Sequence, residues 1–508
     1  MCAKQAGSRL LTAVFKESTP RDLLLFRYRL ILVRENERRS SEDDSSMTAQ
    51  ELPNGFTGFA NRKPGFEPAS ASVGHTPVGG YTTGGGAALA GVPAGYERGA
   101  QGAFQYARDH ARPDAGAASF DPDKLRLIPD TDRRWAWTEV DLNALRHNVA
   151  SLKRHVGPGV RVMAVVKADG YGHGAVRCAK TALNSGAEYL GVATVNEAIE
   201  LREALVNAPI LVLSQPPDEA IPLLLAYKVM PSVYTPDFAI RYAEAADAFG
   251  IRAPYHLAVN TGMNRIGVRH DQVVEFLSQV SFHRALDLVG TFTHFATADA
   301  PETLDFHIQT KRFLEAIQGM RVAGVDPGII HAANSAAAIR YPDVHFDMVR
   351  PGIALYGLHP CPETRTMIEL KPVMSVHARV TDARLVPMSE GVSYGMNYRS
   401  PGSVKICTIP VGYADGLRRG LSGRTDFIVS GQRFRQVGNI CMDQCMFEVD
   451  MRIYGTRRRV DPQIGDEVVL VGRQGDSVVT LDDMANTLGT IHYELSIGFA
   501  QRMPRVYV

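Results

Sequence analysis

The pattern of apolar and polar residues changes near residue 132. Beyond that point, short β-branched runs alternate with amphipathic stretches of helical period, such as residues 175–185, 196–205 and 236–248. This alternation is typical of a parallel sheet whose strands are connected by helices. We expect eight strands, at residues 160–166, 189–193, 209–213, 230–233, 256–259, 286–293, 328–331 and 348–356.

Eight strand–helix repeats over about 220 residues fit an α/β fold of the (β/α)8 TIM-barrel type, with its active site at the carboxyl ends of the strands. A doubly wound parallel sheet is the alternative. It usually carries a glycine fingerprint where the first strand leads into a helix. We assign residues 131–360 to the barrel, with a leading strand near 135–141 that can pair with a second domain.

The alternation stops near residue 360. The rest of the chain, residues 361–508, is predicted to be a mostly β C-terminal domain with one amphipathic helix at 481–488. Turn signals such as Ser430-Gly431 separate its apolar runs. The runs that we expect to form strands are residues 373–385, 404–411, 432–437, 446–449 and 467–471.

Residues 1–130 are rich in Gly, Ala, Pro and Ser, and residues 79–86 read GGYTTGGG. Such a composition buries too little apolar surface to offset the entropy cost of ordering, so we predict a disordered extension. A docking or regulatory tail is the alternative, and Met47 is a second candidate for the translation start. The chain has no run of 18 apolar residues, which argues against a membrane span.

Charge and cysteine content narrow the class of protein. The chain of 508 residues has 55 Lys and Arg against 54 Asp and Glu, so it lacks the basic excess of a nucleic-acid binder. Its six cysteines form no CxxC pair, which fits reduced thiols. With no convincing secretory signal, we expect a cytoplasmic protein.

The segment MAVVKADGYGHG, residues 163–174, carries candidate chemistry. An apolar strand ends at Lys167, where a barrel has its active site, and a glycine-rich turn follows. Partial desolvation there lowers the pKa of a lysine, as Schiff-base chemistry requires. A surface lysine before an ordinary turn is the alternative. The glycine spacing matches neither the dinucleotide fingerprint nor the P-loop.

This segment resembles the pyridoxal-phosphate (PLP) attachment segment of bacterial alanine racemases, which belong to fold type III. Further motifs follow in the order of that family, over about residues 132–508. They are NTGMNRIGV (260–268), THFATAD (293–299), HAANSAA (331–337), MVRPGIALYG (348–357), GVSYG (391–395), PVGYADG (410–416), GNICMDQ (438–444), TIHYE (490–494) and RMPRVY (502–507).

The resemblance implies that Lys167 holds PLP, which acts as an electron sink. It also implies that Arg350 faces the pyridine nitrogen of PLP and that His294 hydrogen-bonds Arg350 and a second base. No metal is among the implied groups. The implied phosphate ligands are Tyr171, Ser335, Tyr493 and the backbone of Gly352 and Ile353.

Racemisation needs one base on each face of the bound substrate. By resemblance, Lys167 takes the α-proton of D-alanine and Tyr394, from the second subunit of a homodimer, takes that of L-alanine. A phenol near pKa 10 is a poor base at pH 7, so neighbouring cations must lower its pKa. Met442, through its backbone, and Asp443 are implied to cross the same interface, and Tyr413 to line the substrate entrance.

The chain departs from the family pattern near Arg265, which is implied to contact the cofactor's phenolic oxygen and the substrate carboxylate. Many family members have a carbamylated lysine seven residues earlier, where this chain has Ala258, and Asn260 replaces the usual aspartate. We hypothesise that an anion such as chloride, or another side chain, orients Arg265, and that activity does not depend on bicarbonate.

The resemblance implies an alanine racemase that supplies D-alanine for peptidoglycan. A racemase of broader specificity and a PLP-dependent decarboxylase of the same architecture are the alternatives. Tyr394 and Arg350 favour a racemase, because decarboxylases of this fold have an acidic residue at the ring nitrogen. A PLP carrier and a binding protein with a degenerate racemase fold are further alternatives, but both candidate bases are present.

Overall fold

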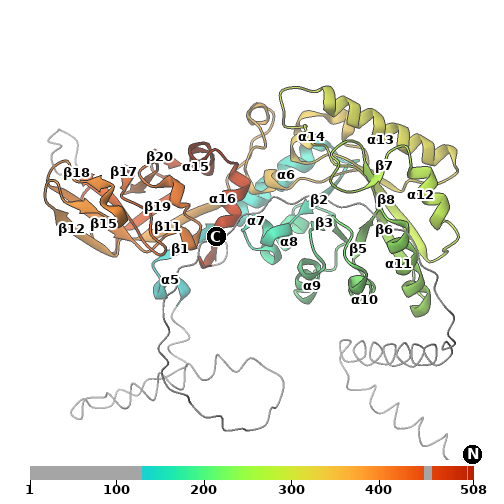
Figure 1. Ribbon diagram of the computed structural model, residues 1–508, viewed down its shortest axis with the longest axis horizontal. Coiled ribbons are helices and arrows are strands. Elements are labelled where there is room, and N and C mark those ends of the chain that lie inside the picture. Colours follow the sequence, from blue (N-terminus) through green and yellow to red (C-terminus); the bar gives the residue numbers. More distant parts are fainter. Residues whose placement is uncertain (1–128, 451–459, 500–501) are drawn as a thin grey trace, which may run out of the picture. The chain divides into compact units, whose positions relative to one another are not determined.

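The computed structural model describes residues 129–450, 460–499 and 502–508, within one compact unit that spans Asp123–Val508 (Figure 1). The extension predicted over residues 1–130 lies outside the described residues except for its last two positions. Among the described helices, none has the length and apolar character that crossing a membrane would require.

The first half of the described chain is a closed parallel barrel. Its strands are β2 (Arg161–Val165), β3 (Tyr189–Val192), β4 (Ile210–Val212), β5 (Met230–Val233), β6 (Ala253–Asn260), β8 (Leu286–Phe292), β9 (Ile329–His331) and β10 (Met348–Val349). They pair in the order β5-β4-β3-β2-β10-β9-β8-β6, and β6 returns to pair with β5. The two-residue β7 (Val268–Arg269) pairs in parallel with the end of β6. This closure confirms the barrel and rules out the doubly wound alternative, which would be an open sheet.

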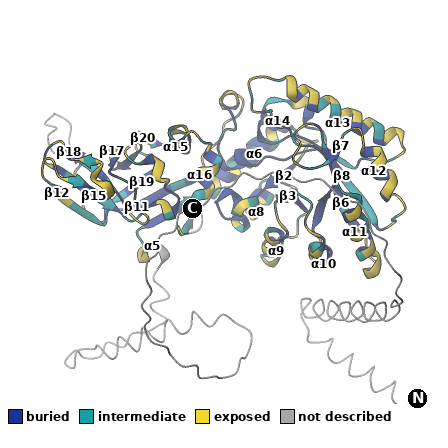
Figure 2. Cartoon of the chain, viewed as in Figure 1, coloured by how far each residue is buried: buried dark blue, intermediate teal, exposed yellow. Residues whose placement is uncertain are grey.

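Helices surround the barrel, with their exposed faces turned outward and the strands buried (Figures 1 and 2). They are α6 (Leu142–Val156), α7 (Lys167–Tyr171), α8 (Ala175–Asn184), α9 (Val195–Glu203), α10 (Ile221–Ala226), α11 (Pro236–Phe249), α12 (Val273–Val280), α13 (Leu304–Val322) and α14 (Ser335–Arg340). A separate apolar cluster made of strand residues, including Met163, Leu211 and Met348, fills the interior that the strands enclose.

The last barrel strand is shorter than predicted. The sequence predicts a strand over residues 348–356, but β10 ends at Val349 and a 3-10 helix, η4, covers Ile353–Tyr356. Pro351 has no N–H to continue the strand, and Gly352 has φ and ψ of −113° and −88°, which are not strand values. The chain therefore turns across the end of the barrel at this point.

The second half forms a ten-stranded sheet. Its strands are β1 (Ala136–Val140), β11 (Met374–Arg379), β12 (Asp382–Val386), β15 (Val404–Ile409), β16 (Asp426–Val429), β17 (Gln432–Val437), β18 (Cys445–Asp450), β19 (Glu467–Gln474), β20 (Ser477–Val479) and β21 (Arg505–Tyr507). The order is β12-β15-β18-β17-β16-β19-β11-β1-β21, with β20 on β19. The leading strand β1 thus belongs to this sheet, antiparallel to β11 and parallel to β21.

Smaller elements complete the β domain: α5 (Asp130–Arg133), the hairpin of β13 (Gly391–Val392) and β14 (Tyr398–Arg399), α15 (Leu481–Leu488) and α16 (His492–Gly498). The single strand predicted at 373–385 is two strands, β11 and β12. The backbone N–H of Val380 donates to the Asp466 carbonyl at 3.0 Å, and that of Thr381 donates to the Thr408 carbonyl at 2.8 Å. The chain therefore changes neighbours between these two residues.

Candidate active site

The turn that follows β2 has a left-handed backbone. Lys167 opens it, directly after the buried strand. The next four residues, Ala168, Asp169, Gly170 and Tyr171, have φ of 51°, 51°, 61° and 54°. This conformation costs a residue with a Cβ about 1–2 kcal/mol, so contacts from outside the turn must hold it.

One strand of the β domain, β21, packs on this turn. Arg505 in β21 pairs with Asp169 at 2.6 Å and donates from Nε to the Gly172 carbonyl at 2.9 Å. A Cβ on Gly174 would lie 1.9 Å from the Tyr507 hydroxyl, so only glycine allows this close approach. The C-terminal strand of the chain therefore supports the lysine turn of the barrel.

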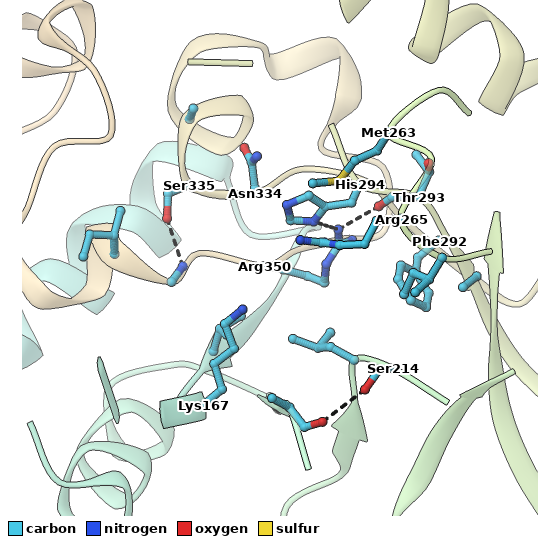
Figure 3. A pocket seen from close by; sticks show the side chains of 18 of the residues that line it. Lys167, Ser214, Met263, Arg265, Phe292, Thr293, His294, Asn334, Ser335 and Arg350 are labelled. Carbon is cyan, nitrogen blue, oxygen red and sulfur yellow. Dashed lines mark hydrogen bonds between the residues drawn. The ribbon is translucent and has the colours of Figure 1, made fainter. Parts of the chain in front are cut away.

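A cavity of about 480 Å³ lies at the carboxyl ends of the barrel strands (Figure 3). It brings together nine of the predicted site residues: Lys167, Tyr171, Arg265, His294, Ser335, Arg350, Gly352, Ile353 and Tyr493. Figure 3 shows Lys167 on one side of the space and Arg350, Arg265 and His294 on the other. The cavity is therefore lined by one lysine and two arginines, with few anions.

The environment of Lys167 lowers its pKa from the ordinary value of 10.5. Burial is the largest cause, because it disfavours the charged amine. The positive charge of Arg265 acts in the same direction, and the carboxylate of Glu197 opposes both. A lysine in this environment is a better nucleophile and base at neutral pH than an exposed lysine.

Arg350 is buried and its guanidinium is held from several sides. Nη1 donates to Nδ1 of His331 at 2.9 Å, and Nη2 donates to the carbonyl of Thr293 at 2.7 Å and to Nδ1 of His294 at 3.3 Å. Its guanidinium carbon lies 5.2 Å from the ring centre of Phe292. Burial lowers the pKa of Arg350 to about 9, with a further contribution from Arg265, so it remains a cation at neutral pH.

A chain of buried histidines stands behind Arg350. Nε2 of His331 contacts Nδ1 of His256 at 2.9 Å. Because Arg350 donates to Nδ1 of His331, the proton of His331 is on Nε2 and points to His256. Burial, followed by the charge of Arg350, lowers the pKa of His294 and His256 to about 3. These imidazoles are therefore neutral, and His294 accepts from Arg350 without adding a charge.

Hydroxyl and amide groups line the opposite end of the cavity. Oγ of Ser335 accepts from the backbone N–H of Gly352 at 2.9 Å and of Ala354 at 3.3 Å. A Cβ on Gly352 would lie 2.3 Å from the Tyr171 hydroxyl, and the rings of Tyr171 and Tyr493 are 6.2 Å apart. Burial raises the pKa of Tyr171 to about 12, so its hydroxyl keeps its proton.

This donor set fits PLP. Neutral hydroxyl and amide donors suit a phosphate group. A lysine of lowered pKa suits an aldehyde, and an arginine beside it suits a ring nitrogen that accepts a hydrogen bond. Lys167, Ser335 and Arg350 stand at three separate edges of the cavity, so one extended cofactor can meet all three.

Arg265 lies at an exposed position, and no ion pair or hydrogen bond to it is recorded within the described part of the chain. The two positions where the family pattern has anionic groups make contacts to other residues instead. Ala258 packs into the apolar cluster with Phe292, and Oδ1 of Asn260 accepts from the N–H of Gly262 and Asn264, both at 3.1 Å. The hypothesis that an anion orients Arg265 stays a prediction.

The other four predicted residues do not line this cavity. The exposed fractions of Tyr394, Met442 and Tyr413 are 75%, 53% and 40%, and Asp443 pairs with Arg502 at 2.7 Å. They lie on neighbouring loops of the β domain. Asn439 donates to the Tyr394 carbonyl at 2.7 Å, and the Met442 carbonyl accepts from Ala414, next to Tyr413, at 3.0 Å. We call the surface of Tyr394, Tyr413, Met442 and Asp443 the tyrosine face.

Sequence reasoning missed several contacts of the site. The sequence pattern gives His331 no role beyond its place at the start of the motif HAANSAA, although its Nδ1 binds Nη1 of Arg350. His256 and Glu197 carried no motif at all. The available signal was the location of both histidines in predicted barrel strands. His331 ends β9 and His256 lies within β6, and both strands pair with β8.

Comparison with known proteins agrees with this geometry. Residues 140–360 match the family model "Alanine racemase, N-terminal domain", and residues 373–507 match "Alanine racemase, C-terminal domain". An alanine racemase of Synechocystis sp. is 42% identical over 378 residues, which cover 74% of this chain and 100% of that protein.

Solved structures give the same result. Alanine racemase from Bacillus anthracis with bound L-Ala-P is 37% identical, with a TM-score of 0.69, over 74% of this chain and 95% of that chain. Histidine racemase from Leuconostoc mesenteroides subsp. sake is 30% identical, with a TM-score of 0.67, over 74% and 98%. The chain therefore belongs to the alanine racemase family, whose members are PLP-dependent amino-acid racemases.

Proposed function

We propose that this enzyme interconverts L-alanine and D-alanine with two bases, Lys167 and Tyr394 of the partner subunit. The observation that carries the proposal is the cavity, which a lysine of lowered pKa lines together with Arg350 and Arg265. The decarboxylase alternative is wrong, because residues 140–360 and 373–507 match the two domain models of the racemase family.

The cofactor ligands remain those that the sequence predicts. Lys167 would hold PLP covalently, and Arg350 would donate to its ring nitrogen. The phosphate would be bound by Tyr171, Ser335, Tyr493 and the backbone of Gly352 and Ile353. When bound, PLP supplies an electron sink for the electron pair that remains when the α-proton leaves.

Arg350 controls the charge at the ring nitrogen by keeping its own proton. Its pKa of about 9 leaves it protonated at neutral pH, so it can donate a hydrogen bond but does not give up a net proton. Its contacts with His331 and Thr293 fix the direction of that donation. We expect this arrangement to suppress side reactions such as transamination.

The two bases act on opposite faces of the substrate. Lys167 removes the α-proton of D-alanine, and the partner subunit's Tyr394 removes that of L-alanine. His294 is neutral and accepts from Arg350 through Nδ1, so its Nε2–H is left to donate to the partner's Tyr394. The charges of Arg350 and Arg265 would then favour the phenolate form of that tyrosine.

The substrate carboxylate would meet Arg265 and the backbone of the partner subunit's Met442. The partner's Tyr413 would line the entrance, and the partner's Asp443 would support this loop. Within one chain Asp443 pairs with Arg502, and Arg502 also lies 3.3 Å from the buried carboxylate of Asp415. This ion pair would keep the backbone at Met442 in place.

The proposal therefore includes a homodimer with two shared active sites. The supporting observation is the tyrosine face, which exposes Tyr394 and Met442 outside the cavity of its own chain. Large apolar side chains exposed together are typical of a surface that binds another protein. Met396, 59% exposed, adds to this surface.

Mixing two inactive variants tests the shared site. Lys167→Ala and Tyr394→Phe are each expected to be nearly inactive. Mixed under conditions that exchange subunits, half of the dimers are mixed, and each has one intact site out of two. About a quarter of the wild-type activity should return, since each site works independently. No recovery, with exchange shown by mass spectrometry, would mean that the two bases belong to one chain.

A racemase of broader specificity is the second candidate. It is favoured by the likeness to a histidine racemase at 30% identity and by Ala258, which leaves a methyl group at the position of a lysine. The test is solvent deuterium exchange at the α-carbon of a panel of amino acids. Exchange confined to alanine supports the narrower proposal.

The biological role that we propose is the supply of D-alanine for peptidoglycan, in the cytoplasm. The described cysteines support a reducing compartment, because Cys178, Cys361, Cys407, Cys441 and Cys445 are all free thiols. Depletion of the enzyme should create a requirement for D-alanine, and a purely catabolic enzyme would create none.

A further inference from the structure

One carboxylate joins the ends of two adjacent barrel strands. Oε1 of Glu197, in α9, accepts from the backbone N–H of Ala168 at 2.7 Å. Oε2 accepts from the N–H of Ala193 at 2.7 Å and of Thr194 at 3.1 Å, at the end of β3. Glu197 therefore ties the residue after Lys167 to the neighbouring strand.

The bond to Ala168 lies where the lysine turn needs support. Ala168 is the first residue of the left-handed run, and the carboxylate of Glu197 is the acceptor of its N–H. A charged acceptor makes a shorter and stronger bond than a carbonyl. Without it, the N–H beside Lys167 would lose its partner, and the direction of the lysine side chain would be less defined.

Glu197 also affects the charge on Lys167. The groups that act on Lys167 are Arg265, which lowers its pKa, and Glu197, which raises it. His294 faces the same space but is neutral, and so is Tyr171, whose pKa is raised by burial. Glu197 is therefore an anion that opposes the effect of Arg265 on the lysine.

Helix capping is the simpler explanation for this side chain. Glu197 is the third residue of α9 and the last residue of a capping box, in which Thr194 Oγ1 accepts from the N–H of Glu197 at 3.3 Å. Of the three bonds that the carboxylate of Glu197 accepts, a capping box requires only the one from the N–H of Thr194. The bonds to Ala193 and Ala168 lie outside that motif, and Ala168 is 29 positions earlier in the chain.

We propose that Glu197 is a positioning residue for the racemase reaction, because its carboxylate holds the N–H of Ala168 and so fixes the place of Lys167. This inference rests on the proposed role of Lys167 as the cofactor lysine. It predicts two effects that a helix cap does not have: a change in cofactor affinity and a change in the pH dependence of the step that Lys167 performs.

The test is Glu197→Gln in the full-length chain. Equilibrium dialysis against PLP should show a dissociation constant about tenfold higher or more, because a bond to a charged group is lost. With holoenzyme in deuterium oxide, we measure, as a function of pH, the initial rate at which deuterium replaces the α-proton of D-alanine. Its acidic limb should move to lower pH, because loss of the anion lowers the pKa of Lys167 further.

Two variants separate positioning from capping. Thr194→Ala removes the hydroxyl of the cap but leaves the carboxylate, so it should lower the melting temperature and leave both readouts at wild-type values. Glu197→Asp keeps the charge but is too short for all three bonds. It should weaken PLP binding without moving the pH limb, and it carries the test if Glu197→Gln does not fold.

The inference is overturned if Glu197→Gln or Glu197→Asp binds PLP as the wild type does. It is also overturned if Thr194→Ala reproduces the changes of Glu197→Gln, because capping would then explain them. If the wild-type chain itself binds no PLP, the proposed function fails together with this inference. A normal wild type with unaffected Glu197 variants leaves the proposed function standing.

Discussion

The cavity of the barrel and the tyrosine face of the β domain are two halves of one proposed site, and they differ in how far a single chain completes them. In the cavity, Arg350 is buried and makes hydrogen bonds to three other residues, His331, Thr293 and His294. On the tyrosine face, the side chain of Tyr394 is 75% exposed. One chain therefore encloses the proposed cofactor site but leaves the proposed second base, Tyr394, exposed.

The backbone explains this difference. Cavity residues stand at the ends of strands whose pairing around the barrel fixes their spacing. Tyr394 lies in a short 3-10 turn, η6 (Tyr394–Met396), between the two strands of a small hairpin. Ser393 before it has a positive φ of 69° and is held by its Oγ, which donates to the Asn439 carbonyl at 2.6 Å. The loop is fixed at its base, and the side chain of Tyr394 at its tip is exposed.

The largest expected effect comes from the barrel half. Lys167→Ala should abolish the visible absorption of bound cofactor and lower racemisation by about 10³-fold or more, because one group holds the cofactor and acts as a base. The assay is coupled oxidation of D-alanine. The exposed Lys180 in α8 supplies the control, and Lys180→Ala should keep both signals. Cofactor bound covalently by the Lys167→Ala protein would contradict the site.

The next effect comes from the tyrosine face. Tyr394→Phe should lower racemisation about 10²- to 10⁴-fold, as is typical for loss of a general base. It should keep the cofactor and the melting temperature, because the side chain is exposed in one chain. Exchange of the α-proton of D-alanine should persist, since Lys167 performs it. Loss of bound cofactor in this variant would mean that Tyr394 is not separate from the cofactor site.

The third prediction concerns acid stability, which should depend on the barrel half. Burial lowers the pKa of His173 to about 4 and of His256 and His294 to about 3. In the unfolded chain these side chains bind protons below pH 6.5, but in the folded chain they do not. The free energy of unfolding should therefore fall with pH below 6.5, by up to about 1.4 kcal/mol per pH unit for each histidine.

His256→Gln tests this origin of acid sensitivity. We measure the free energy of unfolding with denaturant between pH 6.5 and 4. Its dependence on pH should be weaker than in the wild type by the contribution of one histidine, up to about 1.4 kcal/mol per pH unit, whatever the stability at neutral pH. The exposed His307 is the control, and His307→Gln should leave the slope unchanged. Equal slopes in both variants would mean that His256 takes up a proton in the folded chain.

The same comparison shows what the sequence could predict. Strands of the barrel follow from alternation, and the place of Lys167 follows from an apolar strand that ends at a glycine-rich turn. The tyrosine face could be named from family motifs, but local pattern alone gives Tyr394 no role. Pro351 explains why β10 is short, but the apolar run Ile353–Tyr356 that follows it led to the prediction of a longer strand.

Contacts between distant segments were beyond sequence reasoning. His256 and His331 are 75 positions apart, and only the pairing of β6 and β9 with β8 brings their rings together. Glu197 reads as part of a helix start in the run Thr194 to Glu197, and nothing local connects it to Ala168. In both cases the partner is set by strand order, which alternation does not specify.

The smallest expected effect comes from the exposed side of the cavity, at Arg265. Bicarbonate should not change the rate, because Ala258 offers no amine to carbamylate and packs among apolar side chains. If an anion orients Arg265 instead, chloride should lower the KM for alanine when it replaces a bulky anion at constant ionic strength. The assay compares bicarbonate-free buffer with added bicarbonate and added chloride. A rate that rises with bicarbonate would show that another lysine forms the carbamate, and a KM unaffected by chloride would leave Arg265 oriented by the substrate alone.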